Sequence, residues 1–207
     1  MNPRSSFLLC LLASGLGLSA CSLLRSARDT AHYYVLAPMA GAGHDLPQAP
    51  SRQVAFGVGK VKIPSYLLRD PLAVRRGTNE IRYLEGALWA ERLDNALQRV
   101  LAENLACLLT TDQVRLSAWA KEEVQFEIYV SIERFDVNAD GHGEISAWWR
   151  ILSPGASQTL KTGQFHHERA GPQPIATPEG SVATLSLLAE DLSRDLAKTV
   201  AALQGRP

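Results

Sequence analysis

The residue with the clearest chemistry in this sequence is a cysteine near its start. Cys21 is preceded by Leu18–Ala20, and an uncharged apolar run, Phe7–Leu18, begins shortly after Arg4. About a dozen apolar residues match the core of a signal peptide and are too few for a membrane-spanning helix, which needs about 20. An aliphatic residue, two small residues and a cysteine form a lipobox, whose thiol accepts diacylglycerol as a thioether. The sequence therefore predicts a lipoprotein signal peptide over residues 1–20 and a lipidated Cys21.

Lipidation at this position would attach the mature chain to a membrane. Each buried CH₂ contributes about 0.8 kcal/mol, so two or more acyl chains hold a protein stably at a bilayer. In proteobacterial lipoproteins an Asp directly after the cysteine favours retention in the inner membrane, and this chain has Ser22 there. We therefore expect attachment to the periplasmic face of the outer membrane, with residues 21–31 as lipidated cysteine and tether. The alternative is a plain signal peptide followed by a chance cysteine.

Other reactive residue types do not form a recognisable catalytic or metal-binding motif. The sequence has no G-x-S-x-G, H-E-x-x-H, C-x-x-C or Walker-type run. His166 and His167 are adjacent on a predicted strand, where neighbouring side chains point to opposite faces. Asp136, Asp140 and Glu144 surround a predicted turn, which is only weak support for acid–base chemistry. We predict no enzyme, no cofactor and no metal site.

Composition narrows the class of protein further. The 207 residues include 21 basic and 21 acidic ones, mixed along the chain, and no basic block indicates nucleic-acid binding. Cys10 leaves with the signal peptide and Cys21 carries lipid, so Cys107 alone remains and no intramolecular disulfide can form. We expect Cys107, in an apolar helical stretch, to be buried and unreactive. Residues 32–207 are long enough for a single domain with a substantial core.

The elements that must position any site follow from hydrophobic periodicity. Residues 88–109 and 182–203 carry leucines at spacings of three and four, which predicts two amphipathic helices. Three long strand-like runs, joined by turn sequences, predict an antiparallel meander. The strand-like runs are residues 32–38, 52–64, 72–76, 80–86, 124–137, 144–153 and 158–169. This order predicts an α+β fold: a mostly antiparallel sheet with two amphipathic helices packed on one face.

Candidate contact residues lie where a strand-like run ends at Pro64. Tyr66, Leu67 and Leu68 are expected near a sheet end, where they form a patch for a partner or a lipid, with Arg69 as a neighbouring cation. The alternative is that these apolar side chains cap the core below the loop.

A pair of tryptophans supplies a further candidate contact. Trp148 and Trp149 are adjacent on a predicted strand, so one faces the core and the other faces outward. An outward tryptophan favours an interface, because leaving the ring exposed to water is unfavourable. Trp149 is taken as the candidate contact of the two.

Several of these motifs resemble the ABC-type transport auxiliary lipoprotein family. The resemblance rests on "YYVL" at residues 33–36, on Ile63–Leu67 followed by Arg69 and Pro71, and on Leu88–Trp89 ahead of the first leucine helix. It covers nearly the whole mature chain. Family members usually carry Asp after the proline, where this chain has Ser65, so no role tied to that carboxylate carries over.

The resemblance implies a non-enzymatic component of a lipid-transport apparatus. In such systems an ABC ATPase and permease serve periplasmic MCE-domain proteins, and the auxiliary lipoprotein receives the distal end of their tunnel at the outer membrane. A homo-oligomeric ring would match a symmetric tunnel. Two alternatives stay open: a lipid-binding carrier with a pocket between sheet and helices, and an envelope enzyme with a polar cleft around His142 or His166.

Overall fold

The described part of the chain begins just before the first strand. The computed structural model describes residues 30–41, 54–172 and 177–205. The predicted signal peptide and Cys21 lie outside the described residues. From Ala31 onward the chain forms one unit, Ala31–Pro207. In the described ranges, no helix combines the length and apolarity needed to cross a membrane.

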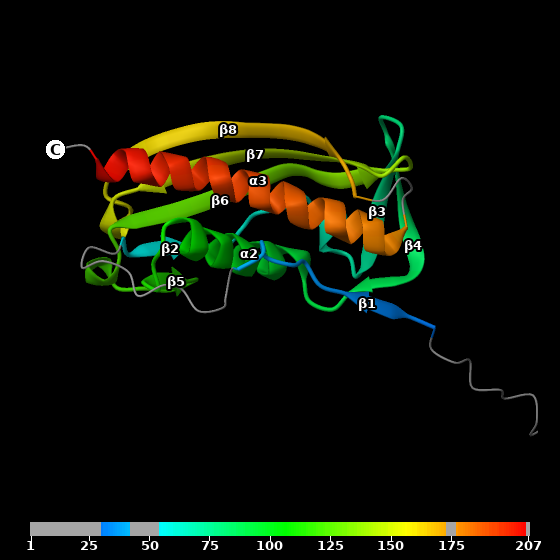
Figure 1. Cartoon of the computed structure of the whole chain (residues 1–207), viewed down its shortest axis with the longest axis horizontal. Helices are drawn as coiled ribbons and strands as arrows, with labels where there is room; N and C mark the ends of the chain where they lie inside the picture. Colours follow the sequence, from blue (N-terminus) through cyan, green and yellow to red (C-terminus); the bar gives the residue numbers. More distant parts are fainter. Residues whose placement is uncertain (1–29, 42–53, 173–176, 206–207) are drawn as a thin grey trace, which may run out of the picture. The chain divides into compact units, whose positions relative to one another are not determined.

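Two long helices in this part of the chain confirm the prediction made from the spacing of the leucines. They are α2 (Leu93–Leu108) and α3 (Pro178–Gln204), which pack against each other (Figure 1). Helix α3 begins with Pro178. The Thr177 hydroxyl accepts a hydrogen bond from the Gly180 N–H at 3.0 Å, so it caps a backbone N–H of the first turn that has no partner within the helix. The core leucines of both stripes are at most 3% exposed: Leu93, Leu97, Leu101, Leu105, Leu185, Leu188, Leu192 and Leu196.

Across the residues that the structure describes, the strands form one eight-stranded sheet. They are β1 (His32–Tyr34), β2 (Phe56–Val58), β3 (Pro71–Arg76), β4 (Glu80–Trp89), β5 (Val114–Leu116), β6 (Phe126–Asn138), β7 (His142–Leu152) and β8 (Thr159–Ala170). Their order is β1-β4-β3-β6-β2-β5, with β7 on the other edge of β6 and β8 beyond β7. Short 3₁₀ turns are η2 (Ser65–Leu68), η3 (Lys121–Glu123) and η4 (Pro154–Ala156).

The expectation of a mostly antiparallel sheet is wrong, because the sheet is mixed. The β3–β4 hairpin and the β6–β7–β8 meander are antiparallel as predicted, since short turns join these strands. The pairs β1–β4, β2–β5, β2–β6 and β3–β6 are parallel. These pairs join strands separated by longer connections, which a local sequence pattern does not report. Helix α2 also begins later than expected, because Leu88 and Trp89 end strand β4.

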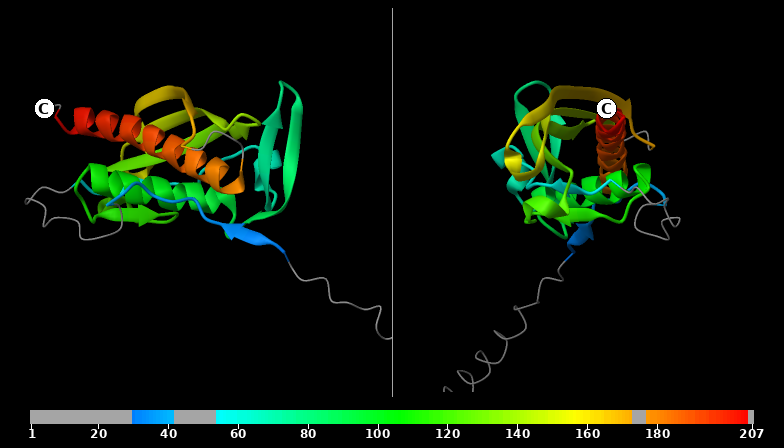
Figure 2. Two further views of the ribbon diagram at one scale, coloured as in Figure 1. Left: turned by 45° about the vertical axis from the view of Figure 1, so that its right-hand side comes forward. Right: turned by 90° about the vertical axis from the view of Figure 1, so that its left-hand side faces the viewer.

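The sheet has a core face and an open face. It curls around α3, which contacts β6, β7 and β8 (Figure 2). Helix α3 comes close to the sheet at Gly143 on β7. A Cβ at this position would lie 2.6 Å from Thr184 Cγ2 and 2.8 Å from Leu188 Cδ1, both on α3. Alternate residues therefore point away from α3. We call this side the open face; it includes Tyr129, Ser131, Asp136, Glu144, Ser146, Trp148, Arg150, Thr162, Gln164 and His166.

Replacing Gly163 tests the packing of the meander. Gly163 on β8 pairs with Trp149 on β7, and a Cβ there would lie 2.3 Å from Trp149 Cζ2. We expect Gly163→Ala to lower the free energy of unfolding by about 1–3 kcal/mol, because the added methyl overpacks the indole. Urea denaturation measures this change. The control is Gln164→Ala at the adjacent exposed position, expected to stay within about 0.5 kcal/mol. Equal stabilities of the two variants would contradict the described packing.

Candidate functional site

The predicted patch after Pro64 divides between core and surface. These residues form η2, which follows the segment that runs beside β6. Leu67 is buried in the core, Tyr66 is half-buried against it, and Leu68 is exposed. The structure thus places Tyr66 and Leu67 as a cap on the core, and only Leu68 is left as an apolar surface residue of this turn.

A buried carboxylate fastens this turn to the sheet. Asp136 on β6 is 1% exposed and accepts the Tyr66 hydroxyl at 3.0 Å. Arg75 on β3 makes a bidentate contact with Asp136, through Nε at 2.9 Å and Nη2 at 2.7 Å. Arg134 Nε adds a third cationic contact at 3.2 Å, and its Nη1 reaches Glu144 at 2.6 Å. Two guanidinium groups therefore compensate a charge that would be unfavourable to bury alone.

The surroundings of Tyr66 raise its pKa, and its neighbour Tyr83 positions Arg69. Burial, followed by the Asp136 carboxylate, raises the pKa of Tyr66 to about 12, while Arg75 acts in the opposite direction. The Tyr83 hydroxyl donates to the Tyr66 carbonyl at 3.0 Å. The Arg69 guanidinium lies over the Tyr83 ring, 5.0 Å from its centroid. Arg69 thus packs on the β3–β4 hairpin, and its other face is exposed.

The structure corrects the choice between the two tryptophans. Trp149 does not face outward: it is 6% exposed and covers Gly163 on the core side, whereas Trp148 is 48% exposed on the open face. The Trp148 indole N–H donates to Glu133 Oε1 at 2.8 Å. Strand alternation requires one ring on each side, but a one-residue change of register would exchange them, so the sequence does not decide which is outside.

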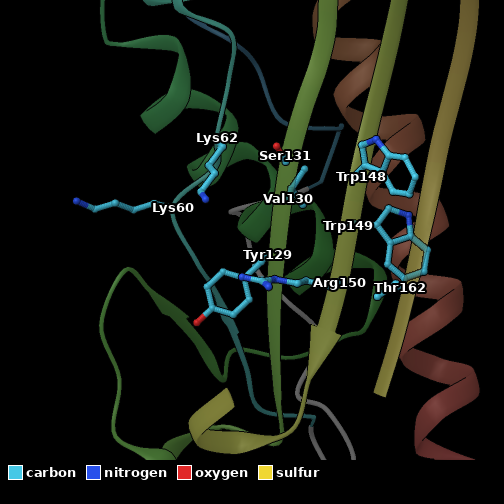
Figure 3. Close-up of a pocket in the computed structure, with 9 residues that line it drawn as sticks. All are labelled: Lys60, Lys62, Tyr129, Val130, Ser131, Trp148, Trp149, Arg150 and Thr162. Atoms are coloured by element: carbon cyan, nitrogen blue, oxygen red, sulfur yellow. The ribbon is translucent and has the colours of Figure 1, made fainter. Parts of the chain in front are cut away.

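A groove in the open face lies beside Trp148. Its volume is about 420 Å³. Lys60 and Lys62 lie on one side and the two tryptophans on the other, with Tyr129 and Arg150 between them (Figure 3). The lining residues are Lys60, Lys62, Tyr129, Val130, Ser131, Trp148, Trp149, Arg150 and Thr162. An adjoining hollow of about 530 Å³ shares both lysines, Tyr129 and Arg150.

Backbone hydrogen bonds position the two lysines. The Gly59 N–H donates to the Ile128 carbonyl at 2.9 Å, and the Lys62 N–H donates to the Val130 carbonyl at 3.1 Å. This segment therefore runs along β6 and presents both lysines at the groove. Gly59 is required here, because a Cβ would lie 2.5 Å from the Tyr129 ring.

Sequence reasoning missed this groove. The signal for it was the alternation of Lys60 and Lys62 with Val61 and Ile63, which places both cations on one side of an extended segment.

Glu144, His166 and Glu168 form the nearest approach to a metal-ligand cluster in the described residues. Their ligand atoms lie within 4.8 Å of one another. Glu144 is already paired with Arg134, and His166 and Glu168 are exposed. The arrangement is that of a surface ion-pair cluster in which His166 contacts both carboxylates at 3.7–3.9 Å.

The groove in the open face therefore brings cations, aromatic rings and hydrogen-bond donors together. Comparison with protein families agrees with the sequence motifs. Residues 34–197 match the family described as ABC-type transport auxiliary lipoprotein component. The chain belongs to this family, which confirms the resemblance.

Solved structures support the fold. One crystal structure of an uncharacterised protein is 21% identical, covers 81% of this chain and 97% of its own, and has a TM-score of 0.64. Protein XCC0632 from Xanthomonas campestris is 14% identical, covers 81% of this chain and 93% of its own, and also has a TM-score of 0.64. At these identities the likeness shows the fold alone. No curated protein matches the chain.

Removing the buried charge tests the network around Asp136. We expect Asp136→Asn to lower the free energy of unfolding by about 3 kcal/mol, because Arg75 and Arg134 would lose their shared counter-charge. The control is Glu190→Gln, which breaks a surface pair with Arg194 and should cost about 0.5 kcal/mol or less. Chemical denaturation followed by circular dichroism measures both. Similar losses in the two variants would contradict a special role for Asp136.

The phenol of Tyr66 makes a pH-dependent contribution to stability. Its pKa in the folded protein, about 12, lies above its ordinary value of 10.0, so folding favours the neutral phenol. The contribution is fully present below pH 10 and is lost as the pH rises toward 12. Compared with Tyr66→Phe, the parent chain should therefore lose its stability advantage across this window. The pKa values of Tyr34 and Tyr129 are also raised. Ultraviolet titration should therefore show one late-titrating phenol fewer in Tyr66→Phe than in the parent chain, and an unchanged number would contradict the assignment.

Proposed function

We propose that this chain is an outer-membrane-anchored periplasmic lipoprotein and a non-enzymatic auxiliary component of an MCE/ABC-type lipid transport system. The observation that carries the proposal is the family match over residues 34–197. The lipobox that ends at Cys21 supports the anchor, and Ser22 after it supports the outer membrane as the site of attachment.

A lipid anchor near the N-terminus would keep the domain within reach of one membrane. Ten residues separate Cys21 from His32, the first residue of β1. Fully extended, such a tether reaches on the order of 35 Å. Tethering raises the effective concentration of the domain for any partner that ends at the same membrane. This is the expected situation for a tunnel that approaches the outer membrane from the periplasm.

The packing of the helices favours the adaptor over the carrier. A carrier with a pocket between sheet and helices requires space along the two leucine stripes. Those side chains are instead buried against each other and the sheet. The two hollows around Lys60 and Lys62 lie on the open face, away from α3. A filled core with an exposed aromatic residue is what an adaptor needs.

Edges of the sheet support self-association. Among the described strands, β1 pairs only with β4, β5 only with β2, and β8 only with β7. Unpaired strand edges are templates for adding another chain. The exposed side chains Tyr33 and Val35 lie at or just after β1, and Leu116 ends β5. We include a homo-oligomeric ring in the proposal: a head-to-tail contact between different edges of neighbouring copies forms a ring when the rotation between copies closes.

Crosslinking in cells tests the proposed function. We expect a pull-down from crosslinked, fractionated cells to recover an MCE-domain protein from the outer-membrane fraction, with a diacylated Cys21 found by mass spectrometry. Cys21→Ser should abolish both the modification and the recovery, whereas Cys107→Ser should preserve them. Failure to recover an MCE-domain protein would contradict the proposed partner, whether or not phospholipid is recovered. An unmodified soluble chain cut after Ala20 would contradict the anchor.

A further inference from the structure

The groove on the open face concentrates positive charge on a chain that is neutral overall. Three of its nine lining residues are the cations Lys60, Lys62 and Arg150, and none is a carboxylate. Acidic and basic residues balance in the whole sequence, with a net charge of zero. The excess here is therefore local, and it attracts anions into the groove.

These three cations are unpaired, in contrast with others on the same sheet. Within the described ranges, no carboxylate forms an ion pair with Lys60, Lys62 or Arg150, and Arg150 instead lies 5.2 Å above the centre of the Tyr129 ring. Arg75 and Arg134, further along the open face, are both bound to Asp136.

The nearest acid in the adjoining hollow is also engaged. Glu127 is buried and accepts the Gly155 N–H at 2.7 Å and the Tyr129 hydroxyl at 3.1 Å. It is therefore committed to holding η4 and Tyr129 in place. The cations of the groove are left available to an external anion.

The far side of the groove is aromatic. Trp148 exposes about half of its surface there, although its indole N–H is held by Glu133. A half-exposed indole beside cations suits a ligand with an anionic end and an apolar end, since Trp and Tyr prefer the boundary between water and hydrocarbon.

Two features argue against an acidic protein segment as the ligand: the small volume of the groove and the lack of a free strand edge beside it. Both edges of β6 are occupied at this level, by β7 and by the Gly59–Lys62 segment. A peptide would find no free strand edge for main-chain hydrogen bonds, which is the usual way that a sheet binds an extended chain. A volume of about 420 Å³ instead suits a small group.

We propose that the groove formed by Lys60, Lys62, Arg150 and Trp148 binds the phosphodiester headgroup of an anionic glycerophospholipid. The phosphate lies among the three cations, and the acyl chains leave past Trp148. This assignment deepens the proposed function by naming a class of lipid, and the choice of phospholipid rests on the proposed membrane anchor; its test requires neither an MCE partner nor a ring.

Fluorescence titration of the purified mature lipoprotein in non-ionic detergent tests the site. The probe is dihexanoyl-phosphatidylglycerol below its micelle concentration. We expect a saturable blue shift of tryptophan emission, weakened by salt and absent in Trp148→Phe, because Trp148 moves to a less polar environment.

Charge reversal locates the binding. Lys60→Glu combined with Lys62→Glu, and separately Arg150→Glu, should each weaken the affinity by about tenfold or more, because charge-assisted contacts to the phosphate are lost. Arg82→Glu combined with Lys198→Glu reverses two exposed cations elsewhere and should leave the affinity unchanged. All these positions are at the surface, and thermal unfolding confirms that each variant is folded.

Three further ligands identify what is recognised. Dihexanoylglycerol lacks the phosphate and should not bind, inorganic phosphate should bind far more weakly than the lipid, and an oligoglutamate peptide should not compete. Equal affinity of the groove and control variants would overturn the site. Equal binding of inorganic phosphate, or binding of oligoglutamate instead of lipid, would overturn the assignment to a phospholipid. None of these outcomes depends on capture of an MCE-domain protein, so the two proposals fail separately.

Discussion

The arrangement of this domain depends on the contacts that the buried carboxylate of Asp136 makes. The β3–β4 hairpin joins β6 through only two paired positions, Val74 with Val137 and Arg75 with Asn138. The contact of Arg75 with Asp136 reinforces this short junction, and Tyr66 brings η2 to the same carboxylate. Because two cations and a hydroxyl converge on one buried charge, loss of the carboxylate affects three elements at once. The Gly59–Lys62 segment leads directly into η2, so the same anchor restrains the lysines of the groove.

Close packing on the core face leaves binding chemistry to the open face. Gly143 lets α3 approach β7, and Gly163 lets Trp149 lie flat on β8. The leucine stripes then fill the space between helices and sheet. A domain packed in this way has little room for an acyl chain inside. What remains for recognition is the sheet surface that α3 does not cover, together with the unpaired strand edges.

Local pattern accounts for much of this fold. The two helices, the β3–β4 hairpin and the β6–β7–β8 meander follow from periodicity and turn residues. Strand β5, three residues long, carries too little pattern to be recognised, and the parallel pairs join segments distant in sequence. The site divides in the same way. Tyr66 and Arg69, predicted as contact residues, pack against other parts of the fold. Trp149, chosen as the contact of the tryptophan pair, faces the core. The groove needs Lys60 and Arg150 brought together across strands, which no single stretch of sequence reveals.

The open face separates two kinds of positive charge, and this separation favours a recognition role for the groove. At one end, Arg75 and Arg134 neutralise acids, which makes them part of the structure. At the other, Lys60, Lys62 and Arg150 have no such partner in the described chain and surround a hollow. Unpaired cations repel one another, so their gathering beside a half-exposed indole is unfavourable for an isolated domain. A ligand with an anionic end and an apolar end would neutralise the cations and cover the indole at the same time. The proposed lipid on Cys21 would hold the chain at a membrane, where phospholipid is the ligand of that chemistry present at the highest local concentration.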